Sequence, residues 1–212
     1  MFLKFDKKYF DRVFTGEDPW HYSLSDYERV KYLRQLEAIQ GFYPQPQSIL
    51  EVGCAEGVFT GMLSEAFPQA KITGVDISAT AIARAREKYQ DHPNVEFIEA
   101  DAIQLFRGGL LPDQRFDVII QSASLHYIFV RLLFQRKLHS YLSGISNRLK
   151  ENGVFLTSNE LNIQTRFMLR ICYFILGKLC QPELAVKYRE WSDFREKHLS
   201  YDLRVFRATS TL

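Results

Sequence analysis

Short apolar runs alternate with helical patterns through the middle of the chain. Five apolar runs predict buried strands, over residues 48–52, 71–76, 94–101, 116–123 and 154–159. Segments with helical spacing lie between them, over residues 58–67, 78–89 and 131–150. Strands that alternate with helices predict a mainly parallel sheet. We therefore expect an α/β fold, Rossmann-like and doubly wound, with helices on both faces of the sheet.

The residues on either side of this alternation predict a helical cap at the start of the chain and a further strand near its end. Ser25 and Glu28 have the spacing of a capping box ahead of a helix that runs to about residue 39. This helix and the residues before it form a predicted helical cap over residues 1–45. Residues 201–208 alternate in polarity, which predicts a strand at the edge of the sheet.

Composition and charge exclude several classes of protein. The 212 residues are 46% hydrophobic and 25% charged, and 27 basic against 25 acidic side chains leave a net charge of +2. Nothing in this balance indicates a nucleic-acid partner. Three cysteines cannot all pair and lack zinc-ligand spacing, so we expect a reducing, cytoplasmic location and no metal. The N-terminus lacks a signal-peptide pattern, and the apolar stretch over residues 167–180 is too short to span a membrane.

A glycine-containing turn follows the first predicted strand. Residues 51–57 read Glu-Val-Gly-Cys-Ala-Glu-Gly, and a strand entering such a turn before a helix forms a ligand crevice in this fold class. A dinucleotide fingerprint would need glycine at positions 53, 55 and 58, but the last two are Ala55 and Val58. Glu51 would repel a phosphate and suits a cationic group. A plain tight turn is the alternative interpretation.

Acidic side chains also end the next two predicted strands. Asp76 ends the second strand, where a carboxylate can accept hydrogen bonds from the vicinal hydroxyls of a ribose. Asp101 ends the third strand and can accept from an exocyclic amine such as that of adenine, while the backbone N–H of Ala102 can donate to a ring nitrogen. Taken singly, these acids would be helix caps or turn residues. Three acids at three successive strand ends predict a binding site.

These motifs resemble those of the class I methyltransferases, which use S-adenosylmethionine. The segments ILEVGCAEG, GVDIS, IEAD and FDVII occur in this order between about residues 45 and 160. The resemblance implies S-adenosylmethionine as cofactor and S-adenosylhomocysteine as product. It assigns the methionine part to the glycine turn, the ribose to the second-strand acid and the adenine to the third-strand acid. The residues expected to bind the cofactor are Trp20, Glu51, Gly53, Cys54, Ala55, Gly57, Asp76, Ile77, Asp101, Ala102 and Gln121.

A narrower resemblance concerns the segment before the sheet. Asp18-Pro19-Trp20, with Tyr-Glu at 27–28 and Lys-Tyr at 31–32, looks like the small-molecule methyltransferases related to nodulation protein S. Members of this group methylate small molecules, including an amine on an aminosugar. An indole attracts cations by roughly 0.5–2 kcal/mol, so Trp20 and the N-terminal helix could form a lid over a sulfonium. Trp20 could instead anchor that helix by packing.

Candidate catalytic residues follow the fourth strand. The narrower group often has an acid before Leu-Tyr-Tyr in this place, whereas residues 123–127 read Ala-Ser-Leu-His-Tyr. His126 is the candidate base because histidine titrates near neutral pH. Tyr127 would line the acceptor pocket, and Glu160, after the fifth strand, could bind a cationic acceptor. Each of the three could instead have a purely structural role.

An apolar segment follows the fifth strand. Residues 164–181 are apolar nearly all round, where folds of this class insert substrate covers. They could form a lid over an apolar acceptor pocket, a dimer surface, a helix resting on a membrane surface or a plain buried helix. The lid interpretation predicts a partly hydrophobic acceptor. Tyr188, Trp191 and Phe194 are three residues apart, which predicts a further helix packed on the sheet.

Together these patterns predict one domain over residues 1–212. The cap is followed by a cofactor-binding core (46–160), a helical insertion that covers the substrate (161–198) and a C-terminal edge strand (199–212). The expected function is methyl transfer to a small-molecule acceptor, to nitrogen in preference to oxygen, by a monomer or homodimer. The alternatives are O-methylation, a protein that binds S-adenosylmethionine without methylating, and a nicotinamide oxidoreductase. The glycine spacing and Glu51 argue against the last.

Overall fold

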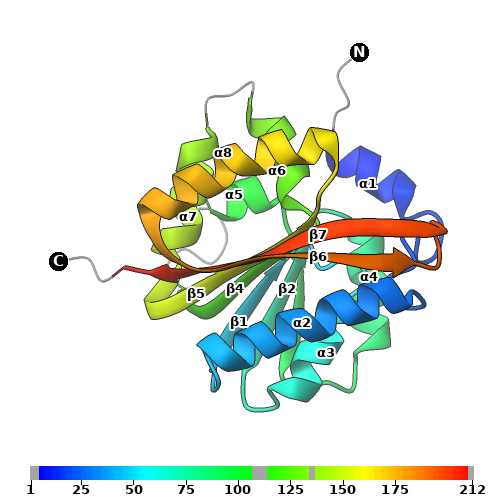
Figure 1. Ribbon diagram of the computed structural model, residues 1–212. Helices are drawn as coiled ribbons and strands as arrows, with labels where there is room; N and C mark the ends of the chain where they lie inside the picture. The colour runs from blue at the N-terminus through cyan, green and yellow to red at the C-terminus, as the bar shows by residue number, and fades with distance from the viewer. Residues whose placement is uncertain (1–4, 107–113, 134–136, 210–212) are drawn as a thin grey trace.

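The computed structural model describes residues 5–106, 114–133 and 137–209. These residues form a seven-stranded sheet with the order β3-β2-β1-β4-β5-β7-β6 (Figure 1). The strands are β1 (Ser48–Val52), β2 (Lys71–Asp76), β3 (Val95–Glu99), β4 (Phe116–Ser122), β5 (Leu149–Glu160), β6 (Cys180–Ser192) and β7 (Lys197–Ala208). The first five pair in parallel, and β7 is antiparallel to both of its neighbours. The predicted α/β fold with a mainly parallel, doubly wound sheet is confirmed.

Helices cover both faces of this sheet. Within the described residues they are α1 (Lys7–Val13), α2 (Asp26–Phe42), α3 (Val58–Ala66), α4 (Ala79–Lys88), α5 (Ala102–Leu105), α6 (Leu125–Leu133), α7 (Leu138–Asn147) and α8 (Ile163–Leu179). Ile39 of α2 and Leu63 of α3 belong to the apolar core on one face. Leu142 of α7 and Leu176 of α8 belong to the core on the other face. None of the helices within the described residues is long and apolar enough to cross a membrane.

The strand order places a crevice at the carboxyl ends of β1 and β4. The chain winds from β1 outward to β3 and then returns to add β4 on the other side of β1. The connections leave in opposite directions at this point, so the strand ends are uncovered there. Ser78 caps α4 as predicted, its hydroxyl oxygen accepting the Ala81 N–H at 3.3 Å. The sequence therefore positions the crevice through local signals.

The C-terminal region departs from the sequence prediction. Only residues 163–179 of the expected helical insertion are helical; residues 180–192 form strand β6, so the helix predicted from the spacing of Tyr188, Trp191 and Phe194 is wrong. Pro182 explains the end of α8, because a proline disfavours helical conformation in the residue before it. Burial then alternates along β6 with the two-residue period of a strand. The predicted edge strand is also wrong, since β7 lies between β5 and β6 and β6 forms the edge.

Two local helix predictions are also corrected. The helix expected over residues 131–150 is divided into α6 and α7, with residues 134–136 outside the described chain. The capping box of Ser25 and Glu28 does not form. The Ser25 hydroxyl donates to Asp193 at 2.9 Å, and Glu28 forms an ion pair with Lys31. A long-range partner for Ser25 and a neighbour on the same helix for Glu28 therefore replace the local cap.

Candidate functional site

A cavity of about 670 Å³, counted to its open mouth, lies at the carboxyl ends of β1, β2 and β4. It is lined by nine of the residues predicted from the sequence: Trp20, Gly53, Ala55, Asp76, Ile77, Asp101, Ala102, Gln121 and Tyr127. Four other predicted residues are not part of its wall: Glu51, Cys54, Gly57 and His126. The ends of β1, β2 and β4 and the residues that follow β3 thus meet at one space, as the topology requires.

The glycine turn has a backbone that side chains would disturb. Gly53 has φ +79°, and a Cβ added there would lie 2.8 Å from the Ser124 hydroxyl. The N–H groups of Gly53 and Cys54 donate to the Val75 carbonyl at 2.7 and 3.1 Å, which ties the turn to β2. Gly57 is the N-cap of α3, and a Cβ there would meet Phe97 at 2.7 Å. Gly57 therefore shapes the turn without facing the cavity.

Asp76 is held at the cavity wall by backbone donors. Its two carboxylate oxygens accept the N–H of Ala55 at 3.0 Å and of Ser78 at 2.9 Å. Burial raises the pKa of Asp76, and these backbone hydrogen bonds act in the opposite direction. Each carboxylate oxygen has two lone pairs, so Asp76 keeps acceptor capacity toward the cavity.

Glu51 lies under the glycine turn in a small neighbouring space. This space shares Gly53, Ala55 and other wall residues with the larger cavity. Burial raises the pKa of Glu51 to about 8, although its carboxylate accepts a hydrogen bond from Thr60 at 2.5 Å. Cys54 packs in an apolar cluster, and burial raises the pKa of its thiol. Cys54 therefore has a packing role. Glu51 is a buried acid that lies behind the residues lining the first cavity.

Asp101 has a partner that the sequence did not reveal. Arg131 of α6 donates to both of its carboxylate oxygens, at 3.0 and 2.5 Å. Asp101 also caps α5 by accepting the Ile103 N–H at 2.9 Å. Arg131 lies 30 residues away along the chain and lines the same cavity. No local pattern marks Arg131, because only the packing of α6 on the sheet brings it to Asp101.

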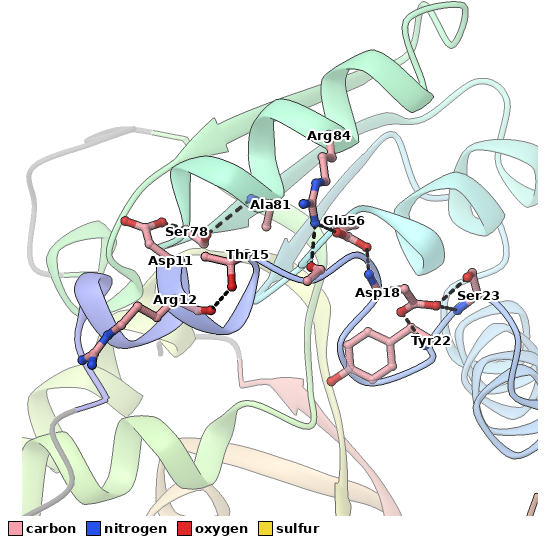
Figure 2. A network of polar contacts seen from close by, with 11 residues as sticks. Asp11, Arg12, Thr15, Asp18, Tyr22, Ser23, Glu56, Ser78, Ala81 and Arg84 are labelled. Carbon is pink, nitrogen blue, oxygen red and sulfur yellow. Dashed lines mark hydrogen bonds and ion pairs between the residues drawn. The ribbon is translucent and has the colours of Figure 1, made fainter. Parts of the chain in front are cut away.

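Polar contacts fix the N-terminal segment against the core (Figure 2). Asp11 of α1 accepts a hydrogen bond from the Ser78 hydroxyl at 2.8 Å. Arg84 of α4 pairs with Glu56 at 2.6 Å and donates to the Gly16 carbonyl at 2.8 Å. The segment is therefore tied both to the start of α4 and to the glycine turn.

The segment around Trp20 forms one side of the cavity. Asp18 has a left-handed backbone with φ 43°, and its carboxylate accepts the N–H of Tyr22 at 2.7 Å (Figure 2). The Trp20 ring centroid lies 5.1 Å from that of Phe14 and 5.7 Å from that of Tyr22. All three rings line the cavity. Trp20 therefore anchors the segment by packing and also forms part of the wall, and its place over a sulfonium stays a prediction.

A second cavity opens next to the first. The two share four wall residues, Trp20, Tyr22, Ala123 and Tyr127. His126 belongs to this second cavity, with its ring centroid 3.9 Å from that of Tyr127. Burial lowers the pKa of His126 to about 4, and its Nδ1 has no hydrogen-bond partner among the described residues. The imidazole is therefore neutral near physiological pH.

Charged side chains of both signs line the second cavity. Glu28 and Lys31 of α2 form an ion pair whose side chains are 12% and 5% exposed. Glu160 and Arg195 form another at 3.0 Å, closer to solvent. The buried Tyr27 hydroxyl has no partner among the described residues. This wall is more polar than the apolar acceptor pocket that the sequence suggested.

The turn between β6 and β7 forms part of the wall of the second cavity. It contributes Phe194 and Arg195 to the wall, whereas α8 contributes Thr165. The Phe194 ring stacks on His21 with centroids 4.0 Å apart. Helix α8 buries one face in the core and contributes Thr165 to this wall, so most of what the predicted insertion adds to the cavity comes from the β6–β7 turn. The sequence missed this turn because residues 188–194 were interpreted as helical.

Comparisons with known proteins agree with this geometry. Residues 49–153 match the model of the methyltransferase domain family. Nodulation protein S of Sinorhizobium fredii is 29% identical over 136 residues, which are 64% of this chain and 59% of that protein. Malonyl-(acyl-carrier protein) O-methyltransferase 1 of Ilyobacter polytropus is 34% identical over 95 residues, which are 45% of this chain and 34% of that protein. The chain thus spans only about a third to three fifths of the length of these relatives.

A solved structure has the same fold over nearly the whole chain. It is N-methyltransferase NodS of Bradyrhizobium japonicum in complex with S-adenosyl-L-homocysteine, which has a TM-score of 0.77 at 20% identity. The superposition covers 96% of this chain and 98% of that one. The family match spans β1 to β4 with the glycine turn and both strand-end acids. This chain therefore belongs to the class I methyltransferases, the family whose cofactor is S-adenosylmethionine, and it resembles the nodulation protein S group within that family.

Proposed function

We propose that the first cavity holds S-adenosylmethionine, with Asp76 at the ribose hydroxyls and Asp101 and Ala102 at the adenine. The free acceptor capacity of Asp76 supports this placement. The buried amide nitrogen of Gln121 lines the same cavity and has no partner within the described residues, so a ligand there would satisfy it. Glu51, in the small space behind Gly53, would face the ammonium group of the methionine part.

We further propose that the protein transfers a methyl group to a small-molecule amine in the second cavity. The observation that supports this proposal is that the two cavities are adjacent and share four wall residues. When bound, the cofactor supplies an electrophilic methyl group. The nitrogen lone pair would form a bond to the methyl carbon while the carbon–sulfur bond breaks, with its electron pair left on the sulfur of S-adenosylhomocysteine. The alkylated nitrogen would then release its proton to solvent. Holding the two ligands in line can supply roughly 7–11 kcal/mol of such a barrier.

The state of His126 favours an amine over a hydroxyl acceptor. A hydroxyl needs a base that removes its proton as it attacks. With its pKa near 4, His126 is a weak base for that step. An uncharged amine already carries a lone pair and needs only a hydrogen-bond acceptor to orient it. The Nδ1 of His126 and the carboxylates of Glu28 and Glu160 are such acceptors in the wall.

A carboxylate acceptor is the second candidate. It also needs no base, and Lys31 and Arg195 in the same wall could hold it. The likeness to a malonyl-(acyl-carrier protein) O-methyltransferase gives this candidate independent support.

Two experiments test the proposal in sequence. Calorimetric titration with S-adenosylmethionine and S-adenosylhomocysteine should show binding, and NADH should show none. Turnover with matched amine and carboxylate acceptors of the same carbon skeleton should then favour the amine. Binding without turnover on any acceptor would support a non-methylating role, and no binding at all would refute the cofactor site.

The location and assembly of the protein belong to the same proposal. All three cysteines are buried and free, which supports a reducing, cytoplasmic compartment. We propose a monomer or a homodimer, to be measured by light scattering.

A further inference from the structure

The outer face of α8 carries large apolar side chains that remain exposed among the described residues. Ile163, Phe167 and Phe174 are 92%, 69% and 65% exposed. The opposite face of the same helix is buried in the core through residues such as Leu169 and Leu176. The helix therefore has a complete inner apolar face and a second apolar strip directed to solvent. Exposed aromatic residues in a row on one helix typically mark a binding surface.

The same outer face is basic. Arg166, Arg170 and Lys178 are exposed, and residues 163–179 contain no Asp or Glu. The Lys178 ammonium lies 4.8 Å from the centroid of the Phe174 ring. The helix alone carries three positive charges, whereas the whole chain carries a net +2. Its charge is therefore concentrated on the strip that also exposes the aromatic rings.

The strip begins at the rim of the second cavity. Asn162 and Thr165, which form the capping box of α8, both line that cavity. Ile163 and Arg166 lie directly beside them in the chain and flank a shallow depression at the same end of the helix. Figure 1 shows α8 in the helical layer above the sheet, where it packs beside α6 and α7 and along β6 and β7. A surface that contacts this strip would therefore lie next to the mouth of the second cavity.

We propose that the outer face of α8, defined as Ile163, Arg166, Phe167, Arg170, Phe174 and Lys178, binds an anionic lipid surface. Aromatic and basic side chains on one face are the pattern of helices that lie in the membrane interface. The rings enter the acyl boundary, and the cations pair with anionic headgroups. A second copy of this chain fits less well, because a two-fold contact through this face would set its cations against one another.

Vesicle co-sedimentation of the full chain tests this proposal without any need for turnover. Binding should occur with phosphatidylglycerol-containing vesicles, should be weak with pure phosphatidylcholine vesicles, and should weaken as salt is raised. The variant R166Q/R170Q should lose about fivefold in affinity per cation, from the roughly 1 kcal/mol that each contributes near such a surface. The variant F167S/F174S should lose at least about tenfold.

Leu24→Ser is the matched control, because Leu24 is 79% exposed and lies outside this face. All variants should keep the wild-type thermal midpoint and S-adenosylmethionine affinity, since none of the changed residues lies in the first cavity. Equal binding to neutral vesicles, or wild-type binding by both α8 variants, would overturn the proposal. Concentration-dependent dimerisation that the variants abolish, without vesicle binding, would assign the face to a second copy instead. Failure here leaves the methyl-transfer proposal intact, which the titration tests separately.

Discussion

Replacing Glu51 with glutamine separates the energetic cost of a buried acid from its proposed role in binding. Glu51 is 4% exposed and has one hydrogen-bond donor, the Thr60 hydroxyl. Glutamine keeps the shape and can still accept that hydrogen bond, but it has no proton to lose. Above the pKa of the unfolded carboxyl, the unfolded wild type ionises Glu51 while the folded wild type still holds the proton, and this difference destabilises the folded state. The variant has no such difference, so its stability relative to wild type should rise with pH.

The magnitude follows from the two pKa values. The unfolded carboxyl titrates near 4.5, and the folded one near 8. Between these values the folded state binds more protons than the unfolded state, so the free energy of unfolding falls as pH rises. The full difference of about 3.5 units corresponds to about 5 kcal/mol at 1.36 kcal/mol per unit. The free energy of unfolding of wild type should therefore fall by about 4 kcal/mol from this group between about pH 5 and about pH 9.

The assay is denaturant unfolding of Glu51→Gln and wild type at both pH values, without cofactor. The stability of the variant relative to wild type should increase by about 4 kcal/mol from the acid to the alkaline condition. Glu65→Gln is the control, because Glu65 is exposed on α3, the helix that carries Thr60. A relative stability that does not change with pH would refute the reasoning, since it would mean that Glu51 is already ionised in the folded protein. Calorimetry should show at least about tenfold weaker S-adenosylmethionine binding by Glu51→Gln, through loss of a charge-assisted hydrogen bond.

Three further predictions concern the cavity walls. Asp76→Asn should weaken S-adenosylmethionine binding at least about tenfold by calorimetry while the circular dichroism spectrum is kept; unchanged affinity would remove Asp76 from the ribose site. His126→Asn should leave cofactor affinity unchanged and lower turnover at least about tenfold, and the wild-type rate should show no His126 titration near pH 6.5 because its pKa is about 4. Arg131→Met should weaken cofactor binding by releasing Asp101 from its two hydrogen bonds, and recovery in Arg131→Lys would be partial because lysine lacks the planar fork. Equal affinity in both Arg131 variants and wild type would show that the ion pair serves only α6 packing.

The walls of the first cavity were largely predictable because their signals are local. A buried strand, a glycine turn and a helix cap each depend on neighbours within a few residues, so β1, β2 and the Ser78 cap lie where the sequence placed them. Parallel pairing then brings Asp76 and Asp101 to the same sheet edge without further information. The sequence did not distinguish wall residues from supporting ones: Gly57 shapes the turn, and Glu51 lies behind it.

The second cavity was decided only by the tertiary structure. Its wall joins α2, the segment around Trp20 and the β6–β7 turn, and Ser25 meets Asp193 across 168 residues of chain. Residues 188–194 are compatible with helical spacing, but pairing of β6 with β7 holds residues 188–192 in a strand, and residues 193–194 belong to the turn that follows. Arg131 reaches Asp101 only because α6 packs on the sheet. Local sequence thus determined the parallel strands, the glycine turn and the acids at the strand ends, because their conformations depend on near neighbours. The fold alone determined the second cavity and its charges, because contacts between distant segments outweigh local preference.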